Sequence, residues 1–229
     1  MLAAETGRPL VQHVVDAARR AMGVRDVIVA TDHPSIATAL RPFGTRCVMT
    51  AATHVSGTDR VAEVARDLPQ EVDVIVNVQG DEPEIEPETI DALIRRIETG
   101  PEEMATAATR FPLEADVGDP NLVKVVAALD GKAIYFSRSA IPFHREADGK
   151  NEAYYLHQGI YAYRRRFLMK FTDWGPTPLE LTERLEQLRV LEHGERIAVI
   201  RTDRAINGID TPQQYAGFVS RYKTKVARE

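Results

Sequence analysis

The sequence has little cysteine, no long apolar run and no excess of positive charge. Its single cysteine, Cys47, can form no intramolecular disulfide, which fits a reducing cytoplasm. No window approaches the ~20 apolar residues that span a bilayer, and the first residues lack the pattern of a secretory signal. With 29 basic and 34 acidic residues, the chain lacks the basic excess of nucleic-acid-binding proteins. We therefore expect no membrane span, no nucleic-acid partner and a cytoplasmic location.

The composition is that of a globular protein that needs no disulfide or metal to fold. Of the 229 residues, 44% are hydrophobic and 28% are charged. A chain of this length buries about 70% of the surface that its unfolded form exposes. We find no internal repeat and expect a single domain over residues 1–229.

The first half of the chain alternates short β-branched runs with helical patterns. This alternation predicts βαβ units and a mostly parallel central sheet in an α/β fold. The apolar run DVIVNV suits a strand that is covered on both faces. The predicted strands cover residues 26–30, 46–49 and 73–78, and the predicted helices cover residues 8–22, 34–40, 58–68 and 86–98.

The pattern changes after residue 105. Asp130-Gly131 separates two apolar runs and predicts a β-hairpin. Residues 144–152 are polar and aperiodic, which indicates a loop. We expect a smaller β-rich insertion at about 105–165. The predicted strands here cover residues 123–129, 133–136, 159–163 and 197–201, and the predicted helices cover residues 179–191 and 211–226.

Two acidic segments follow predicted strands. Asp81 and Glu82 come after the strongest strand, next to Gly80, and ligands of α/β sheets bind beyond the carboxyl ends of strands. Mg²⁺ needs only one or two protein carboxylates when a substrate supplies phosphates. Asp210 has a similar position before the last helix. The alternatives are a polar turn for the first segment and a helix N-cap for Asp210.

Several other polar residues could bind an anion. Ser56 and Gly57 precede a helix, where anions are favoured, and Arg60 adds a positive charge. The alternative is a capping loop with a solvated arginine. Arg138 follows a strand, and arginine binds carboxylates or phosphates with two parallel hydrogen bonds.

Two further residues have an open role. Lys124 lies within an apolar run, so it either lies at a sheet edge or is directed at an anion. His157 lies at the start of a strand, and a lone histidine of this kind is more often structural than catalytic.

Eight motifs appear together in one order along nearly the whole chain, and together they resemble the 3-deoxy-manno-octulosonate cytidylyltransferase (CMP-Kdo synthetase) family. The motifs are VATDH (29–33), HVSGTDR (54–60), NVQGDEP (77–83), PNLVKVV (120–126), YFSRSAIP (135–142), HQGIYAYRR (157–165), LEQLRVLEHG (185–194) and GIDTP (208–212).

The resemblance implies a Rossmann-like nucleotide-diphospho-sugar transferase fold and a homodimer. It implies a reaction in which CTP and Kdo give CMP-Kdo and pyrophosphate with Mg²⁺, for lipopolysaccharide biosynthesis. The region 105–165 would then serve sugar binding and dimerisation. The implied site residues are Asp81 and Asp210 for the metal and catalysis, Ser56, Gly57 and Arg60 for the nucleotide, and Gln79, Arg138, His157, Glu186 and Gln187 for Kdo.

The sequence departs from the family pattern at its beginning. The family usually begins with a strand and a loop of the type I-P-A-R-x-x-S-x-R-L-P-x-K, which holds the CTP phosphates, whereas Met1-Leu2 stands about where that loop ends. On this pattern we expect the 229-residue chain to be unstable and to bind CTP weakly.

Three alternatives to this function remain at the level of the sequence. They are a cytidylyltransferase for another acidic sugar such as a sialic acid, a catalytically impaired sugar- or nucleotide-binding remnant, and a metal-dependent glycosyltransferase. The last typically carries a D-x-D motif, which the segment QGDEP does not match.

Overall fold

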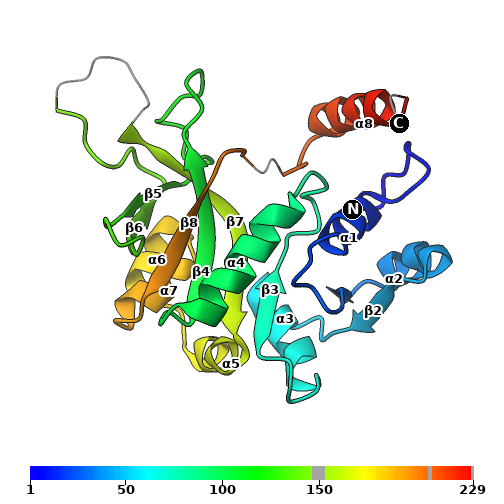
Figure 1. The fold of residues 1–229 in the computed structure, drawn as a ribbon, viewed down its shortest axis with the longest axis horizontal. Coiled ribbons are helices and arrows are strands. Elements are labelled where there is room, and N and C mark those ends of the chain that lie inside the picture. Colours follow the sequence, from blue (N-terminus) through cyan, green and yellow to red (C-terminus); the bar gives the residue numbers. More distant parts are fainter. Residues whose placement is uncertain (146–152, 206–207, 228–229) are drawn as a thin grey trace. The chain divides into compact units, whose positions relative to one another are not determined.

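The computed structural model describes residues 1–145, 153–205 and 208–227. These residues form two compact units, and Figure 1 shows their elements. Most of the predicted loop at 144–152 lies outside the described residues. Unit 1 comprises Met1–Asp67, Val78–Asp91 and Ile206–Glu229, and unit 2 comprises Leu68–Asn77 and Ala92–Ala205.

Unit 1 contains a two-stranded parallel sheet. Strand β1 (Ile28–Thr31) pairs with β2 (Arg46–Met49), and helix α2 (Pro34–Leu40) connects them. A 3-10 turn, η1 (Arg41–Phe43), ends at Gly44, whose φ of 62° favours glycine because it has no Cβ. The predicted βαβ arrangement is therefore present here, with strand ranges within two residues of those expected.

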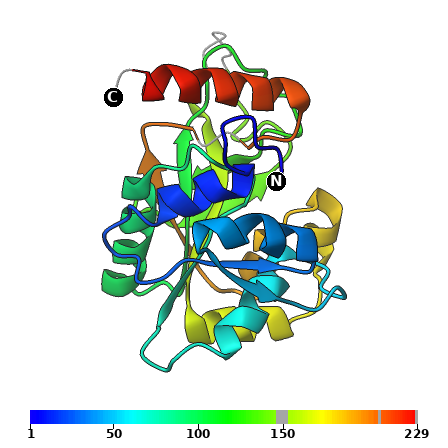
Figure 2. The same ribbon diagram turned by 90° about the vertical axis from the view of Figure 1, so that its right-hand side faces the viewer.

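The first and last helices of unit 1 pack against each other. Helix α1 (Leu10–Ala18) contributes Leu10, and α8 (Pro212–Val226) contributes Phe218 and Val219 to one buried cluster. Figure 2 shows α8 lying along α1. This packing attaches the end of the chain, and with it the segment before α8, to the beginning of the chain.

Unit 2 is built on a six-stranded sheet. Its strand order is β6-β5-β7-β4-β8. The remaining strand, β3, pairs with the C-terminal part of β7, residues 161–164. Strand β4 is buried along almost its whole length. The strands are β3 (Val74–Asn77), β4 (Met104–Arg110), β5 (Lys124–Ala127), β6 (Ala133–Ser137), β7 (Tyr155–Arg164) and β8 (Ile197–Thr202).

The strand directions in unit 2 differ from the expected mostly parallel sheet. Only β4 and β8 pair in parallel among its described strands, and the other pairs are antiparallel. The reason is that β7 lies between β4 and β5 and runs against both. The α/β class holds, but βαβ units do not account for the larger sheet.

Strand β7 has a bulge opposite β4. Thr106 pairs with Tyr161, whereas the next residue, Ala107, pairs with Gln158, so Gly159 and Ile160 are extra residues on β7. Because two residues are inserted, residues on either side of the bulge keep their faces. The bulge therefore changes the local course of the strand without exchanging its two sides.

The predicted helices are present, but α1 ends at Ala18 rather than near residue 22 and one predicted helix is broken in two. Helix α4 (Pro87–Thr99) matches its prediction, but the segment 179–191 forms two helices, α6 (Pro178–Glu183) and α7 (Gln187–Glu192). The break occurs at Arg184, which has a φ of 54° and ends α6. The spacing of the leucines alone could not show this break between the two helices.

Two elements were not expected from the sequence. Strand β4 was missed because its sequence, MATAATR, has little β-branched or aromatic character. Helix α5 (Arg165–Asp173) begins directly after β7 and buries Phe167, Leu168 and Phe171. Helix α3 (Gly57–Arg66) in unit 1 agrees with the prediction.

Candidate active site

Two carboxylates and a glycine meet in unit 1. The backbone N–H of Ile209 donates to the carbonyl oxygen of Asp81 at 2.9 Å, which joins the segment before α8 to the turn at Asp81. A Cβ placed on Gly208 would lie 3.8 Å from a carboxylate oxygen of Asp81 and 3.8 Å from one of Asp210. The tertiary structure thus brings together two acids that are far apart in the sequence.

Asp210 is not the cap of the helix that follows it. Thr211 is the N-cap residue of α8, and its hydroxyl accepts from the backbone N–H of Gln214. The Gln214 side chain accepts from the backbone N–H of Asp210 in return. The N-cap alternative for the Asp210 side chain is therefore wrong, and its carboxylate remains available for a ligand.

The electrostatics of this pair favour a bound cation. Burial raises the pKa of Asp81, and the charge of Asp210 together with a hydrogen bond to it raises the pKa further. Two like charges at short range are costly until a cation neutralises them. Within the described ranges no group of three or more histidine, cysteine or acidic residues could hold a metal. Two carboxylates fit Mg²⁺ that also binds substrate phosphates.

Glu82, next to Asp81, is mostly uncharged at neutral pH. It is 7% exposed, and burial together with the charge of Asp81 raises its pKa to about 8. Its Oε2 atom has no hydrogen-bond partner among the residues that the structure describes. The side chain of Gln79, in contrast, is exposed at the beginning of the same turn.

The residues expected at the nucleotide lie at the ends of β1 and β2. Arg60 donates to Asp32, directly after β1, at 2.9 Å and to Thr50, directly after β2, at 2.5 Å. Ser56 is the N-cap of α3, and nothing lies within 4 Å of a Cβ placed on Gly57. Arg60 is thus a fixed cation at the carboxyl ends of two parallel strands, not a solvated one.

Arg138, in unit 2, binds three backbone carbonyl oxygens from two other segments of the chain. Its guanidinium donates to the carbonyl oxygens of Glu183 at 2.6 Å, Pro120 at 2.8 Å and Arg184 at 3.2 Å. Three of its five N–H groups are used in this way, and the other two have no partner among the residues that the structure describes. The geometry fixes the arginine against the turn that precedes Glu186.

Lys124 follows neither alternative considered for it. Its side chain is fully buried, and Nζ donates to the carbonyl oxygens of Asp119 at 3.0 Å and Arg138 at 2.6 Å. Burial lowers its pKa. The lysine joins β5 to the residue after β6 and thereby supports the backbone of Arg138.

His157 lies between two aromatic rings on β6 and β7. The ring centroids of Phe136 and Tyr161 lie 4.9 Å and 5.6 Å from that of His157. Burial lowers the pKa of His157 to about 3. The imidazole is therefore neutral at physiological pH and acts through hydrogen bonds rather than through charge.

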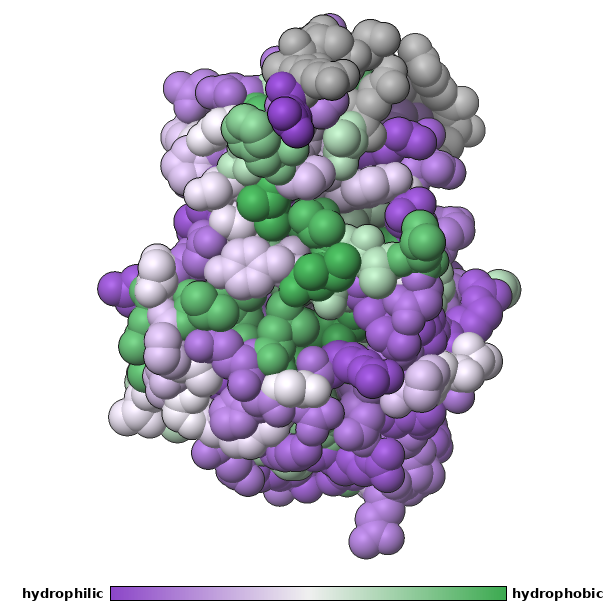
Figure 3. Space-filling view, turned by 90° about the vertical axis from the view of Figure 1, so that its left-hand side faces the viewer, coloured by the Kyte–Doolittle hydropathy of each residue, from purple (hydrophilic) through white to green (hydrophobic). Residues whose placement is uncertain are grey.

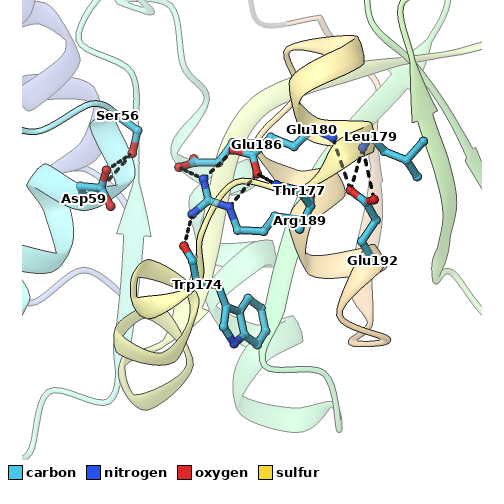
Figure 4. A network of polar contacts seen from close by, with 9 residues as sticks. All are labelled: Ser56, Asp59, Trp174, Thr177, Leu179, Glu180, Glu186, Arg189 and Glu192. Atoms are coloured by element: carbon cyan, nitrogen blue, oxygen red, sulfur yellow. Dashed lines mark hydrogen bonds and ion pairs between the residues drawn. The ribbon is translucent and has the colours of Figure 1, made fainter.

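Glu186 and Gln187 begin helix α7 and are supported by a buried ion pair. Arg189 donates to both carboxylate oxygens of Glu180, at 2.5 and 2.7 Å, and Nη2 lies 3.9 Å from Glu186 (Figure 4). Gln187 is 3% exposed, and its Nε2 has no partner within the part of the chain that the structure describes. An orphaned buried amide is costly, which is consistent with a ligand-binding role.

Comparison with known proteins identifies the family. The family model described as Cytidylyltransferase matches residues 2–197. The 3-deoxy-manno-octulosonate cytidylyltransferase of Geotalea uraniireducens is 48% identical, covering 95% of this chain and 90% of the relative. That of Anaeromyxobacter sp. is 50% identical, covering 93% and 85%. This chain belongs to the CMP-Kdo synthetase family.

Solved structures agree with this assignment. A CMP-Kdo synthetase complexed with CTP superposes with a TM-score of 0.91 at 36% identity, covering 98% of this chain and 91% of that one. A 4-diphosphocytidyl-2C-methyl-D-erythritol synthase from Anaerococcus prevotii shares only the fold, with a TM-score of 0.63 at 13% identity. The nucleotide-diphospho-sugar transferase type of α/β fold, expected from the motifs, is thus confirmed.

The CMP-Kdo synthetase motifs locate the site residues but not their supports. The structure brings Asp81 and Asp210 together in unit 1, where Arg60 also lies, and places Arg138 beside the turn that leads to Glu186 in unit 2.

Sequence reasoning missed four residues that hold the predicted site residues. These residues are Asp32, Thr106, Glu180 and Glu183. Asp32 lies within a recognised motif and two of the others lie shortly before one, whereas Thr106 lies in no motif and had no sequence signal.

Proposed function

We propose that this protein transfers CMP from CTP to Kdo, releasing pyrophosphate, and that its product serves lipopolysaccharide biosynthesis. The observation that carries the proposal is the similarity of nearly the whole chain to a CMP-Kdo synthetase complexed with CTP. The curated relatives, at 48% and 50% identity, have the same name.

Asp81 and Asp210 would hold Mg²⁺. When bound, Mg²⁺ supplies a Lewis acid that neutralises phosphate charge and lowers the pKa of the sugar hydroxyl that attacks the α-phosphorus. The carboxylates themselves would orient the ion, and Gly208 lies beside both of them, where an added Cβ would be 3.8 Å from each. Arg60 would add a fixed positive charge for the nucleotide, with Ser56 and Gly57 at the N-terminus of α3.

Kdo would be held by five residues. Arg138 has two N–H groups that no described residue occupies and that could bind a carboxylate, and His157 is an uncharged hydrogen-bonding group. The buried amide of Gln187 lacks a partner among the described residues, which a sugar hydroxyl would supply. Glu186 and Gln79 would complete the set. No described side chain has the position of an obvious general base, so these residues chiefly position and neutralise the substrates.

We also propose a homodimer formed through unit 2. Ile134 on β6 and Leu179 and Leu181 on α6 are large apolar side chains that are exposed. Figure 3 shows apolar residues gathered on the side of the molecule where β5, β6 and α6 lie in Figure 1. Exposed apolar patches mark interaction surfaces. Sedimentation of the protein, with Leu181→Glu as the test variant, is expected to give a dimer that the variant weakens.

The cytoplasm is the proposed place of action. The described part of the chain contains no helix long and apolar enough to cross a membrane. The one cysteine is free, which suits a reducing compartment.

The test of the function is pyrophosphate release from CTP in the presence of Kdo and Mg²⁺. We expect turnover that depends on all three, and a rate at least ~100-fold lower for Asp81→Asn and Asp210→Asn. Asp26→Asn is the matched control, because Asp26 is exposed and its carboxylate contacts only Arg46 and the backbone N–H of Val27 among the described residues.

Each other outcome of this assay has a distinct meaning. Near-normal turnover of either test variant at saturating Mg²⁺ would remove that residue from the metal site. CTP binding without turnover would indicate an impaired remnant, and turnover with a sialic acid in place of Kdo would indicate the other sugar class.

A further inference from the structure

The hydroxyl of Thr106 lies at the centre of the bulge between β4 and β7. The side chain is fully buried, and its Oγ1 lies 2.8 Å from the carbonyl oxygen of Ile160 and 3.2 Å from that of Gln158. It also lies 3.0 Å from Nε2 of His157. Two backbone carbonyl oxygens at the bulge of β7 thus lie within hydrogen-bond distance of this one hydroxyl.

We propose that Thr106 is a positioning residue that keeps the ring proton of His157 on Nε2 and leaves Nδ1 to accept a hydrogen bond from a hydroxyl of the sugar. The second half of this proposal rests on the proposed Kdo site. The first half depends only on contacts within unit 2.

A count of protons determines the direction of the hydrogen bonds. A hydroxyl donates one proton and accepts with its lone pairs, whereas a carbonyl oxygen only accepts. The carbonyl oxygens of Ile160 at 2.8 Å and Gln158 at 3.2 Å can only accept, so the single Thr106 proton is directed at them, chiefly at the nearer one, and is not available to His157. The Thr106 oxygen then accepts from Nε2–H of His157.

The same count leaves Nδ1 with a free lone pair. A neutral imidazole has one ring proton, and burial lowers the pKa of His157 to about 3, so the ring does not take up a second. Nδ1 has no hydrogen-bond partner among the residues that the structure describes. Phe136 and Tyr161 lie at 4.9 and 5.6 Å between ring centroids and limit rotation of the imidazole.

This arrangement defines which group of Kdo the histidine can take. A lone pair accepts from a hydroxyl but repels a carboxylate, so His157 would bind one of the hydroxyls of the sugar. The carboxylate would then need a cationic or N–H donor elsewhere, such as Arg138. His157 would therefore contribute to sugar orientation and not to charge recognition.

The experiment compares three threonine variants. Thr106→Val removes the hydroxyl at nearly constant shape, and Thr106→Ser keeps it. Thr109→Val is the matched control, because Thr109 is a buried threonine on the same strand whose hydroxyl donates to the carbonyl oxygen of Thr202 at 2.9 Å. The readouts are ring ¹⁵N NMR of labelled histidine, assigned with His157→Gln, and KM for Kdo and for CTP.

We expect the wild type, Thr106→Ser and Thr109→Val to show protonated Nε2 and unprotonated Nδ1. Thr106→Val should lose this single tautomer and raise the Kdo KM by about 2- to 10-fold, with the CTP KM unchanged. A wild type with the proton on Nδ1, or a Thr106→Val ring signal identical to wild type, would overturn the proposal without affecting the proposed activity.

A separate outcome concerns the sugar contact. If His157→Gln left the Kdo KM unchanged while the NMR result held, the assignment of Nδ1 to the sugar would be overturned. The proposed activity itself would be refuted only if the wild-type protein released no pyrophosphate. That measurement is independent of these variants.

Discussion

Lowering the pH should destabilise the protein through His157. Its pKa is lowered from 6.5 to about 3 in the folded chain because burial disfavours the charged ring. The unfolded chain therefore binds more protons than the folded one between these values. The stability that the neutral ring contributes is fully present above about pH 6.5, and it falls continuously as the pH drops towards 3.

The size of this effect follows from the two pKa values. At pH 5 the unfolded histidine is almost fully protonated and the folded one is almost fully neutral. The linkage relation then gives a loss of about 2 kcal/mol between pH 7 and pH 5. This is a large share of a total stability of ~5–15 kcal/mol.

Other groups also titrate in this range, so a variant must isolate His157. Glu82 has a pKa raised to about 8, and the pKa of Asp81 is also raised. Raised acid pKa values have the opposite sign, since they add stability as the pH falls. His157→Gln keeps both acids and removes only the imidazole, so the difference between the two pH dependences reports on His157.

Urea unfolding at pH 7 and pH 5, followed by circular dichroism, measures this difference. We expect the wild type to lose about 2 kcal/mol more than His157→Gln over this interval. Parallel pH dependences for the two proteins would refute the reasoning. A proton NMR titration of His157 that showed protonation near pH 6 in the folded state would identify the error as the pKa itself.

Three further predictions concern helix ends and the buried ion pair, each measured as a change in the free energy of unfolding in urea. Glu180→Gln should cost about 3 kcal/mol, because Arg189 has a side chain only 7% exposed and would lose its charged partner; a cost below 1 kcal/mol would contradict this. Arg184→Gly should stabilise the protein by roughly 0.5–1 kcal/mol, since φ is 54° at this position; destabilisation would show that the arginine side chain contributes more than its backbone strain costs. Thr211→Ala should cost about 1 kcal/mol through loss of the N-cap of α8, whereas Thr211→Ser should cost little and serves as the control.

Periodicity was sufficient to predict the elements whose side chains alternate in a simple way. Helix α4 has Ile90, Leu93, Ile94 and Ile97 buried at helical spacing, and β1 and β3 are β-branched runs. Strand β4 could not be predicted because its small residues have no strong strand preference. They suit a strand that lies between β7 and β8 and is buried on both faces. The break at Arg184 depends on one backbone conformation and leaves no periodic signal.

The order of motifs along the chain determined the family, because each motif is short but their joint occurrence in one order is specific. It also named the residues of the site. What the sequence could not determine is how those residues are held. From its own segment Asp210 was a better candidate for a helix cap than for a ligand, whereas in the folded structure the hydroxyl of Thr211 takes the cap.

Contacts between residues distant in sequence decided the rest. Thr106 and His157 are 51 residues apart, and only the pairing of β4 with β7 brings the hydroxyl to the ring. Any arginine has a guanidinium that can bind an anion. In this structure, however, three N–H groups of the Arg138 guanidinium already donate to backbone carbonyl oxygens, one from Pro120 and two from the end of α6. The sequence determines which groups are available for chemistry, whereas tertiary structure decides which hydrogen bonds they have already made, because burial and strand pairing assign each donor its acceptor.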